Sequence, residues 1–322
     1  MMPKERIETQ DSVLVGIIRD FLVAHQMLGS LLERWRQGTL RFQDIEDFVG
    51  DSERSILFRL KEKSHALFRS ATKDGAPMRT GELVDLAVGS LFHEAMKLRE
   101  NLYQQEFYVP RIEALRKEAD DVPDPLFSEF ERILGSASER LAETFEETQA
   151  LFALTLRQLR LLMAANRENG LVPRFLWQNR KLVSNVFPER LEGLLSELYG
   201  DVGTGFVFIT ESYLDSAYFE EALEVLLEVD QRGDSRPEFE RLFHYASGMA
   251  AFLRGEYAKS LECLASWLAL GPGRSEERYL AFAGVAVSRI PDFSEAKADR
   301  MLSDGARAMA EQIEGWLARM DR

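Results

Sequence analysis

Three short blocks in the C-terminal third of the chain constrain its fold more than any other feature. The blocks are Phe219–Ala222, Tyr257–Ser260 and Phe293–Ala296, and each places an aromatic residue three positions before a small one. The aromatic residues are separated by 38 and 36 positions. A period of this length is typical of stacked helical hairpins, because each hairpin needs its neighbours to bury its apolar face. The pattern therefore predicts a helical repeat rather than a closed domain.

The composition is that of a folded, acidic protein. Hydrophobic residues make up 45% of the 322 positions, which is enough for a sizeable core. The net charge of -14 argues against nucleic acid or anionic membranes as partners, since both favour a basic surface. The apolar stretch Val13–Ile18 stops at Arg19, too early for a signal peptide or a membrane span. Cys263 is the single cysteine. We therefore expect a cytoplasmic protein without membrane insertion.

Helical periodicity extends through the first 200 residues. Apolar residues three, four or seven positions apart predict a helix over residues 11–37, and residues 41–70 predict two more, separated near Gly50. A further helix is expected over residues 80–103, with Thr80 as its N-cap. The side chains expected to pack in the core from this helix are Leu83, Ala87, Leu91 and Phe92.

A long helix is predicted to connect this bundle to the repeat. The apolar pattern extends over residues 126–169, and some forty helical residues span about 60 Å. A break at residues 120–125 precedes it, and a bend is expected near Gly135. Gly170 ends it, and two shorter helices are expected to follow, the second opened by Pro188.

These patterns predict an all-α fold. No stretch alternates polar and apolar residues for long enough to form a sheet, and the strand-like Phe206–Ile209 lies within the repeat, which favours a helix. We expect a helical bundle over residues 1–200 and a short solenoid of helical hairpins over residues 201–322. The solenoid is expected to contain a C-terminal capping helix and three copies, at about 203–236, 241–274 and 277–310.

The central copy has family-specific spacing. Counted from Arg241, Gly248 is the eighth residue and Gly255 the fifteenth. The next positions of the pattern are Tyr257, Ser260, Leu264 and Pro272. The block resembles a tetratricopeptide repeat, and the flanking copies are weaker, with Thr210 in place of the first glycine. The resemblance implies that two helices approach closely at Gly248 and that the chain turns at Gly255. The departures in the central copy are His244, Ser247, Ala251 and Trp267.

The resemblance implies a concave groove, lined by the first helix of each copy, that holds a helix or an extended segment of another protein. An apolar groove suits an amphipathic partner. Alternatively, Tyr245 and Phe252 pack inside the protein. The residues expected to line the groove are Leu242, Tyr245, Met249, Phe252, Arg278, Val285 and Arg289.

Charge is distributed unevenly between neighbouring segments. Residues 151–190 contain seven basic and two acidic side chains, whereas residues 191–240 contain two basic and thirteen acidic ones. Such blocks keep a surface soluble, attract each other or steer a charged partner. One hypothesis is an exposed basic patch that binds an acidic protein surface. Its residues are Arg174, Trp177, Arg180 and Lys181.

Few residues point to catalysis or to a cofactor. Glu62 and His65 have the Glu-x-x-His spacing of di-iron bundles, but those sites use the motif twice and add further glutamates. The four histidines leave few combinations for a zinc site. Gly200–Gly205 resembles a phosphate-binding loop without its lysine, and it is better explained as the hinge into the repeat. We predict no catalytic residue, metal or cofactor.

The predicted function is a non-catalytic adaptor or scaffold that binds another protein through the groove. The second hypothesis is a regulator in which a small peptide closes the repeat against the bundle, and this construction resembles that of bacterial peptide sensors. A metal-dependent enzyme is the least favoured class. Nucleic-acid binding is not expected, because aromatic interleaving of the basic residues, as by Trp177, is limited and the surroundings are acidic.

Overall fold

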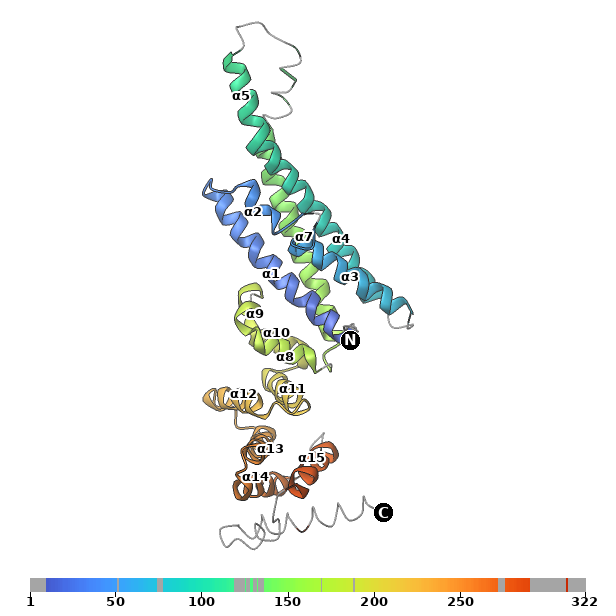
Figure 1. Cartoon of the computed structure of the whole chain (residues 1–322), viewed down its shortest axis with the longest axis vertical. Helices are drawn as coiled ribbons and strands as arrows, with labels where there is room; N and C mark the ends of the chain where they lie inside the picture. Colours follow the sequence, from blue (N-terminus) through green and yellow to red (C-terminus); the bar gives the residue numbers. More distant parts are fainter. Residues whose placement is uncertain are drawn as a thin grey trace, which may run out of the picture. The chain divides into compact units, whose positions relative to one another are not determined.

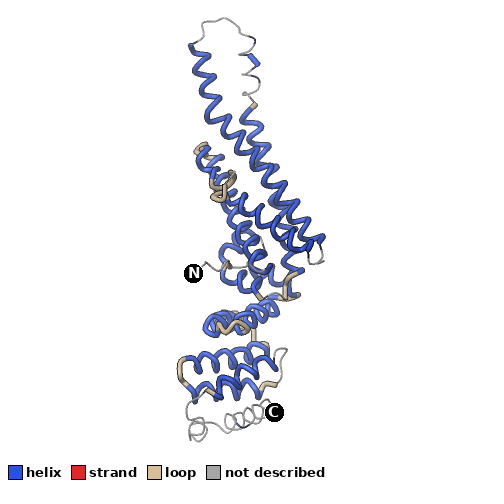
Figure 2. Tube along the Cα trace, turned by 45° about the vertical axis from the view of Figure 1, so that its right-hand side comes forward, coloured by secondary structure: helices blue, strands red, loops and turns tan. Residues whose placement is uncertain are grey.

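The regular elements of the protein are helices throughout the described residues, as the computed structural model shows (Figures 1 and 2). This confirms the all-α prediction. The structure describes residues 10–50, 52–73, 78–118, 125, 128–129, 132, 136–168, 170–187, 189–271, 276–289 and 311. The chain divides into two compact units, Met1–Leu191 and Glu192–Arg322. The predicted boundary, after residue 200, lies at the end of helix α10 (Arg190–Tyr199), whereas this division lies near its start.

The first unit is a helical bundle. Helix α1 packs on α3, α3 on α4 and α4 on α7, while α8 and α9 also contact α1. The element η1 is a single π-helical segment that follows α4. The bounds are α1 (Gln10–Arg36), α2 (Phe42–Glu46), α3 (Ile56–Lys73), α4 (Met78–Tyr103), η1 (Gln104–Tyr108), α5 (Val109–Glu118), α7 (Ala137–Ala165), α8 (Leu171–Gln178) and α9 (Arg180–Val186).

Aromatic side chains join the helices of this bundle. Phe152 of α7 contacts Phe21 of α1, with 5.4 Å between ring centroids, and it stacks on Phe48 at 6.1 Å. One end of α1 is held by Trp35, which stacks on Phe145 at 5.0 Å. All but Trp35 are almost completely buried, so the seven-residue spacing of Phe145 and Phe152 places one stripe of α7 in the core.

Helix α1 confirms its predicted pattern. Leu14, Ile17, Phe21 and Leu28 are all buried, in helical steps, and the helix ends before Gly38, whose φ is +66°. By length and composition, α1 is the one helix among the described residues that is apolar enough to cross a membrane. About half of that apolar stretch is buried inside the protein, as in the core helix of a bundle.

Helix α4 corrects two details of the sequence reading. It begins at Met78, so Thr80 lies inside the first turn and is not the N-cap. Leu83 is 40% exposed, because the stripe that faces the core begins at Val84, one position later. Ala87 and Leu91 are buried as predicted.

The predictions for the region around α7 are confirmed in part. Helix α7 has 29 residues, and the predicted extension over 126–135, the break at 120–125 and the bend at Gly135 lie outside the described residues. Three helices follow α7 rather than the two predicted, because the helix is interrupted at Asn179, between α8 and α9. The Asn179 side chain donates a hydrogen bond of 2.9 Å to the carbonyl of Phe175. This local bond competes with continuation of the helix.

The second unit is a succession of packed helices. Helix α11 packs on α12, α12 on α13 and α13 on α14, while α13 also contacts α11 and α15. The helix pairs α11–α12 and α13–α14 coincide with the first two predicted copies, and Phe206–Ile209 is helical as predicted. The second half of the third copy and the capping helix lie outside the described residues. The bounds are α11 (Val202–Leu214), α12 (Phe219–Gln231), α13 (Pro237–Leu253), α14 (Tyr257–Ala269) and α15 (Glu276–Ser288).

Gly248 lies where α13 and α14 approach most closely. A Cβ atom added there would lie 2.7 Å from Cγ of Leu264 and 3.2 Å from the carbonyl oxygen of Ser260. Glycine is therefore required, as the spacing predicted. In α11 the close approach is at Gly205, whose added Cβ would lie 2.7 Å from Cβ of Leu195 in α10.

Candidate protein-binding clefts

Three of the residues predicted to line the groove are buried. Leu242 and Tyr245 have no exposed surface, and Met249 is 5% exposed. A partner cannot contact these side chains unless α13 unpacks from its neighbours. The prediction that they line an open groove is therefore wrong.

An aromatic cluster explains their burial. The ring of Tyr245 stacks on Tyr279 of α15 at 4.5 Å, and its centroid lies 5.1 Å from Trp267 of α14 and 6.2 Å from Phe219 of α12. Four helices thus meet at one side chain. The Tyr245 hydroxyl is buried without a hydrogen-bond partner among the described residues, and burial raises the pKa of this phenol. For Tyr245 the alternative interpretation, packing inside the protein, is correct.

The other predicted groove residues are nearer the surface. Phe252 is half-buried beside Tyr257, with 5.7 Å between ring centroids. Val285 and Arg289 are exposed. Arg278 is exposed and forms an ion pair of 3.0 Å between its Nη1 and Oδ2 of Asp215. The buried part of α13 therefore does not join these residues into one groove, and their role in binding a partner stays a prediction.

The predicted basic patch also needs a correction. Trp177 is 4% exposed, because it lies on the buried face of α8 together with Phe175 and Leu176. The guanidinium of Arg180 lies 4.5 Å from the centroid of the Trp177 ring. Arg180 and Lys181 are exposed and Arg174 is half-buried, so only the cations remain as a candidate surface.

A cavity of about 410 Å³ lies between α12 and α13 and the loop that joins them. Its apolar side chains are of two kinds. Leu226, Val229 and Phe239 are buried and form its floor. Leu227 and Phe243 are 51% and 39% exposed and form its walls. We call this site the α12–α13 cleft.

The rim of the α12–α13 cleft is acidic. Asp230, Asp234 and Glu240 lie around it, and Arg236 is its only cation among the described residues. Nη2 of Arg236 lies 2.6 Å from Oδ1 of Asp201, and its Nε lies 3.3 Å from Oδ1 of Asp234. The exposed Asp230 and Glu240 form no ion pair with the described residues, so an uncompensated negative charge remains at the rim.

The glycine-rich segment before α11 positions Arg236. Asp201 is the N-cap of α11 and accepts a hydrogen bond of 2.9 Å from the backbone N–H of Thr204. The guanidinium of Arg236, followed by the Thr204 bonds, holds the pKa of the Asp201 carboxyl well below its usual range. The guanidinium occupies the space that a Cβ atom at Gly203 would need. Gly203 and Gly205 thus serve packing, whereas Gly200 adopts a φ of +92°.

The sequence reading missed the α12–α13 cleft, although a signal was present. Leu226 and Leu227 are consecutive, as are Leu242 and Phe243. Neighbouring residues of a helix lie about 100° apart around its axis, so a narrow core stripe cannot bury both members of each pair. In both pairs the second residue faces outward.

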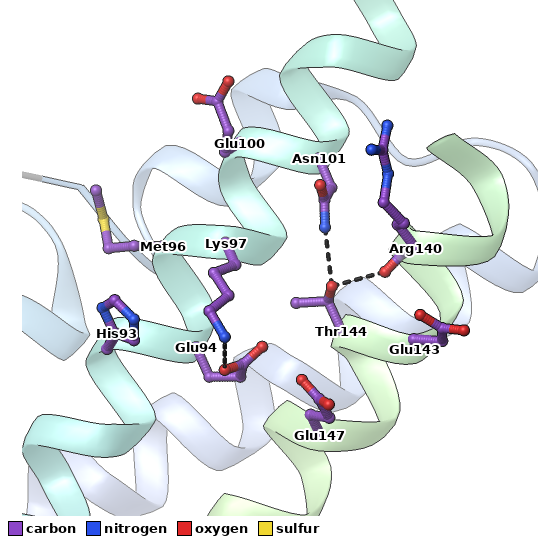
Figure 3. A pocket seen from close by; sticks show the side chains of 10 residues that line it. All are labelled: His93, Glu94, Met96, Lys97, Glu100, Asn101, Arg140, Glu143, Thr144 and Glu147. Carbon is purple, nitrogen blue, oxygen red and sulfur yellow. Dashed lines mark hydrogen bonds and ion pairs between the residues drawn. The ribbon is translucent and has the colours of Figure 1, made fainter. Parts of the chain in front are cut away.

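A second cavity, of about 510 Å³, lies between α4 and α7, and most of the residues that line it are polar or charged (Figure 3). Nδ2 of Asn101 donates a hydrogen bond of 2.8 Å to Oγ1 of Thr144, which joins the two helices directly. Nζ of Lys97 lies 2.8 Å from Oε2 of Glu94. The cavity is also lined by five other charged or titratable residues, His93, Glu100, Arg140, Glu143 and Glu147.

The candidate catalytic and metal-binding residues lie in surroundings that do not point to a reactive site. Nδ1 of His65 lies 3.3 Å from Oδ2 of Asp85, and its side chain is 44% exposed. Within the described residues, no group of three or more histidine, cysteine or acidic side chains is arranged to hold a metal ion. Cys263 is half-buried, and burial raises the pKa of its thiol.

The two cavities differ in the kind of contact they offer. The α12–α13 cleft exposes apolar walls under an acidic rim, whereas the α4–α7 cavity is lined by polar and charged groups. Comparison of the chain with family models, with curated proteins and with solved structures finds no match.

Proposed function

We propose that this protein is a non-catalytic adaptor that binds a basic, amphipathic segment of another protein in the α12–α13 cleft. The exposure of Leu227 and Phe243 above a cavity with a buried apolar floor supports this proposal. Single exposed apolar residues are common on protein surfaces, but two that converge on one cavity form a site for an anchoring side chain.

The apolar part of the cleft supplies affinity. A leucine, methionine or phenylalanine of the partner would enter the cavity between Leu227 and Phe243 and contact the floor. Complete burial of such a side chain contributes about 1.5–3 kcal/mol. A few anchors of this kind carry most of the binding energy in protein interfaces.

The charge of the cleft selects the partner. Asp230 and Glu240 form no ion pair with any residue that the structure describes, and Arg236 already contacts two carboxylates. A partner with lysine or arginine next to its apolar anchor would compensate this charge, whereas an acidic partner would be repelled. The acidic surplus of residues 191–240 would also speed the encounter at low ionic strength.

The double substitution Leu227→Glu with Phe243→Glu tests the apolar contact. We expect a loss of affinity for the natural partner of at least about tenfold, because both walls become charged in an acidic site. The measurement is quantitative capture of partners from a lysate of the source cells by the tagged chain. Leu253→Glu is the matched control, because Leu253 is 67% exposed on the same helix and does not line the cleft.

The outcome of this test is informative in both directions. Unchanged helical content of the double variant by circular dichroism would show that it still folds. The proposal is wrong if the folded double variant retains the same partners as the control.

A further inference from the structure

The seam between α4 and α7 contains a buried carboxylate with an unsatisfied oxygen. Glu94 is 7% exposed, and its Oε2 accepts a hydrogen bond of 2.8 Å from Nζ of Lys97. Its Oε1 is shielded from solvent and accepts no hydrogen bond within the described residues. A shielded acceptor of this kind carries a desolvation cost unless a donor reaches it.

Glu147 of α7 is the group that faces Glu94 across the seam. The two carboxyl groups lie next to each other in Figure 3, and the Glu147 side chain is exposed to solvent. Two ionised carboxylates repel each other at this separation, and neither has a hydrogen to donate. If Glu147 holds a proton, it donates to Glu94 and satisfies the shielded oxygen.

The charged groups around the pair belong to the same two helices. All residues that line the cavity come from α4 and α7. A hydrogen bond that protonated Glu147 would donate to Glu94, and the charge of Glu94, raise the pKa of the Glu147 carboxyl; partial desolvation and Glu143 raise it further, and Lys97 lowers it. The other titratable groups that line the cavity are His93, Glu100 and Arg140.

We propose that Glu94 and Glu147 form a proton-dependent latch that holds α4 against α7. When Glu147 is protonated, it bonds to Glu94 and closes this part of the seam. When Glu147 is ionised, the two carboxylates repel each other and the seam opens locally. The uncharged bond between Asn101 and Thr144 lies beyond the pair and keeps the helices joined there.

The sign of the pH dependence follows from the raised pKa. The pKa of Glu147 in the folded protein lies above its ordinary value of 4.5. The latch is therefore fully formed below about pH 4.5, and its contribution is lost as the pH rises through the folded value. Most paired carboxylates in proteins have the opposite dependence, because their folded pKa is lowered.

Hydrogen exchange of the full chain tests the latch. We expect the protection of residues 91–101 and 141–150 to fall roughly threefold to tenfold between about pH 5 and about pH 8, after correction for intrinsic exchange, as for loss of one hydrogen bond. In Glu147→Gln the amide donates to Glu94 at every pH, so protection should stay at the wild-type level of low pH. Glu146→Gln is the matched control and should keep the wild-type dependence, because Glu146 is equally exposed but does not line the cavity.

Several results would overturn the latch. One is wild-type protection that does not change with pH, and another is a Glu147→Gln variant that keeps the wild-type dependence. Restoration of protection at high pH by millimolar Mg²⁺ would show that a cation, not a proton, bridges the pair. If Glu147→Gln does not fold, carboxyl-carbon NMR of the wild type decides, because the latch requires Glu147 to titrate above the exposed control Glu146.

Discussion

Replacement of Tyr245 by alanine is expected to lower the free energy of unfolding of the second unit by about 3–5 kcal/mol. The ring is completely buried and contacts Phe219, Trp267 and Tyr279, so its removal leaves a cavity where four helices meet. A chain with two units need not unfold in one step, so a single midpoint is not a sufficient measure. The measurement is hydrogen exchange of α13 and α14 under increasing denaturant.

Tyr245→Phe is the control that isolates the hydroxyl. No residue that the structure describes forms a hydrogen bond with this buried hydroxyl, so its removal should be neutral or stabilising by up to about 1 kcal/mol. A loss for Tyr245→Phe as large as for Tyr245→Ala would contradict this description, because it would mean that the hydroxyl, not the ring, holds the four helices.

Gly248→Val should destabilise the second unit by about 3 kcal/mol. The added side chain would collide with Leu264, which is completely buried, and with the backbone of α14 at Ser260. The helices would have to separate to accommodate it. The measurement is again the exchange protection of α13 and α14.

Gly89→Val is the matched substitution for this prediction. Gly89 also lies within a helix, α4, but an added Cβ meets nothing within 4 Å. Its effect on the first unit should therefore stay within about 0.5 kcal/mol. Equal tolerance of valine at both glycines would exclude a close approach of α13 and α14.

Helices could be predicted from this sequence because their signals are local. The stripe of α1, the pair α13–α14 and the role of Gly248 all follow from residues a few positions apart. The break at Asn179 was missed, because it depends on one side-chain bond to the backbone. The tetratricopeptide-like resemblance fits the helix pairs and the glycine contact, but it stays a prediction.

The candidate site could be predicted only in part. Periodicity gives the angle between apolar residues on a helix, but it does not say which neighbour covers them. Tyr245 is buried because Tyr279, 34 positions later, stacks on it. Phe243, two positions earlier, is left exposed beside the α12–α13 cleft. That difference arises from tertiary packing, and the residues adjacent in the sequence do not reveal it.

The central claim is that a basic, apolar segment binds in the α12–α13 cleft, and hydrogen exchange of the chain with and without its captured partner tests it most directly. The account predicts new protection in α12 and at the start of α13, together with protection of a partner segment that carries lysine or arginine beside an apolar residue. New protection confined to other helices, with α12 and α13 unchanged, would contradict it.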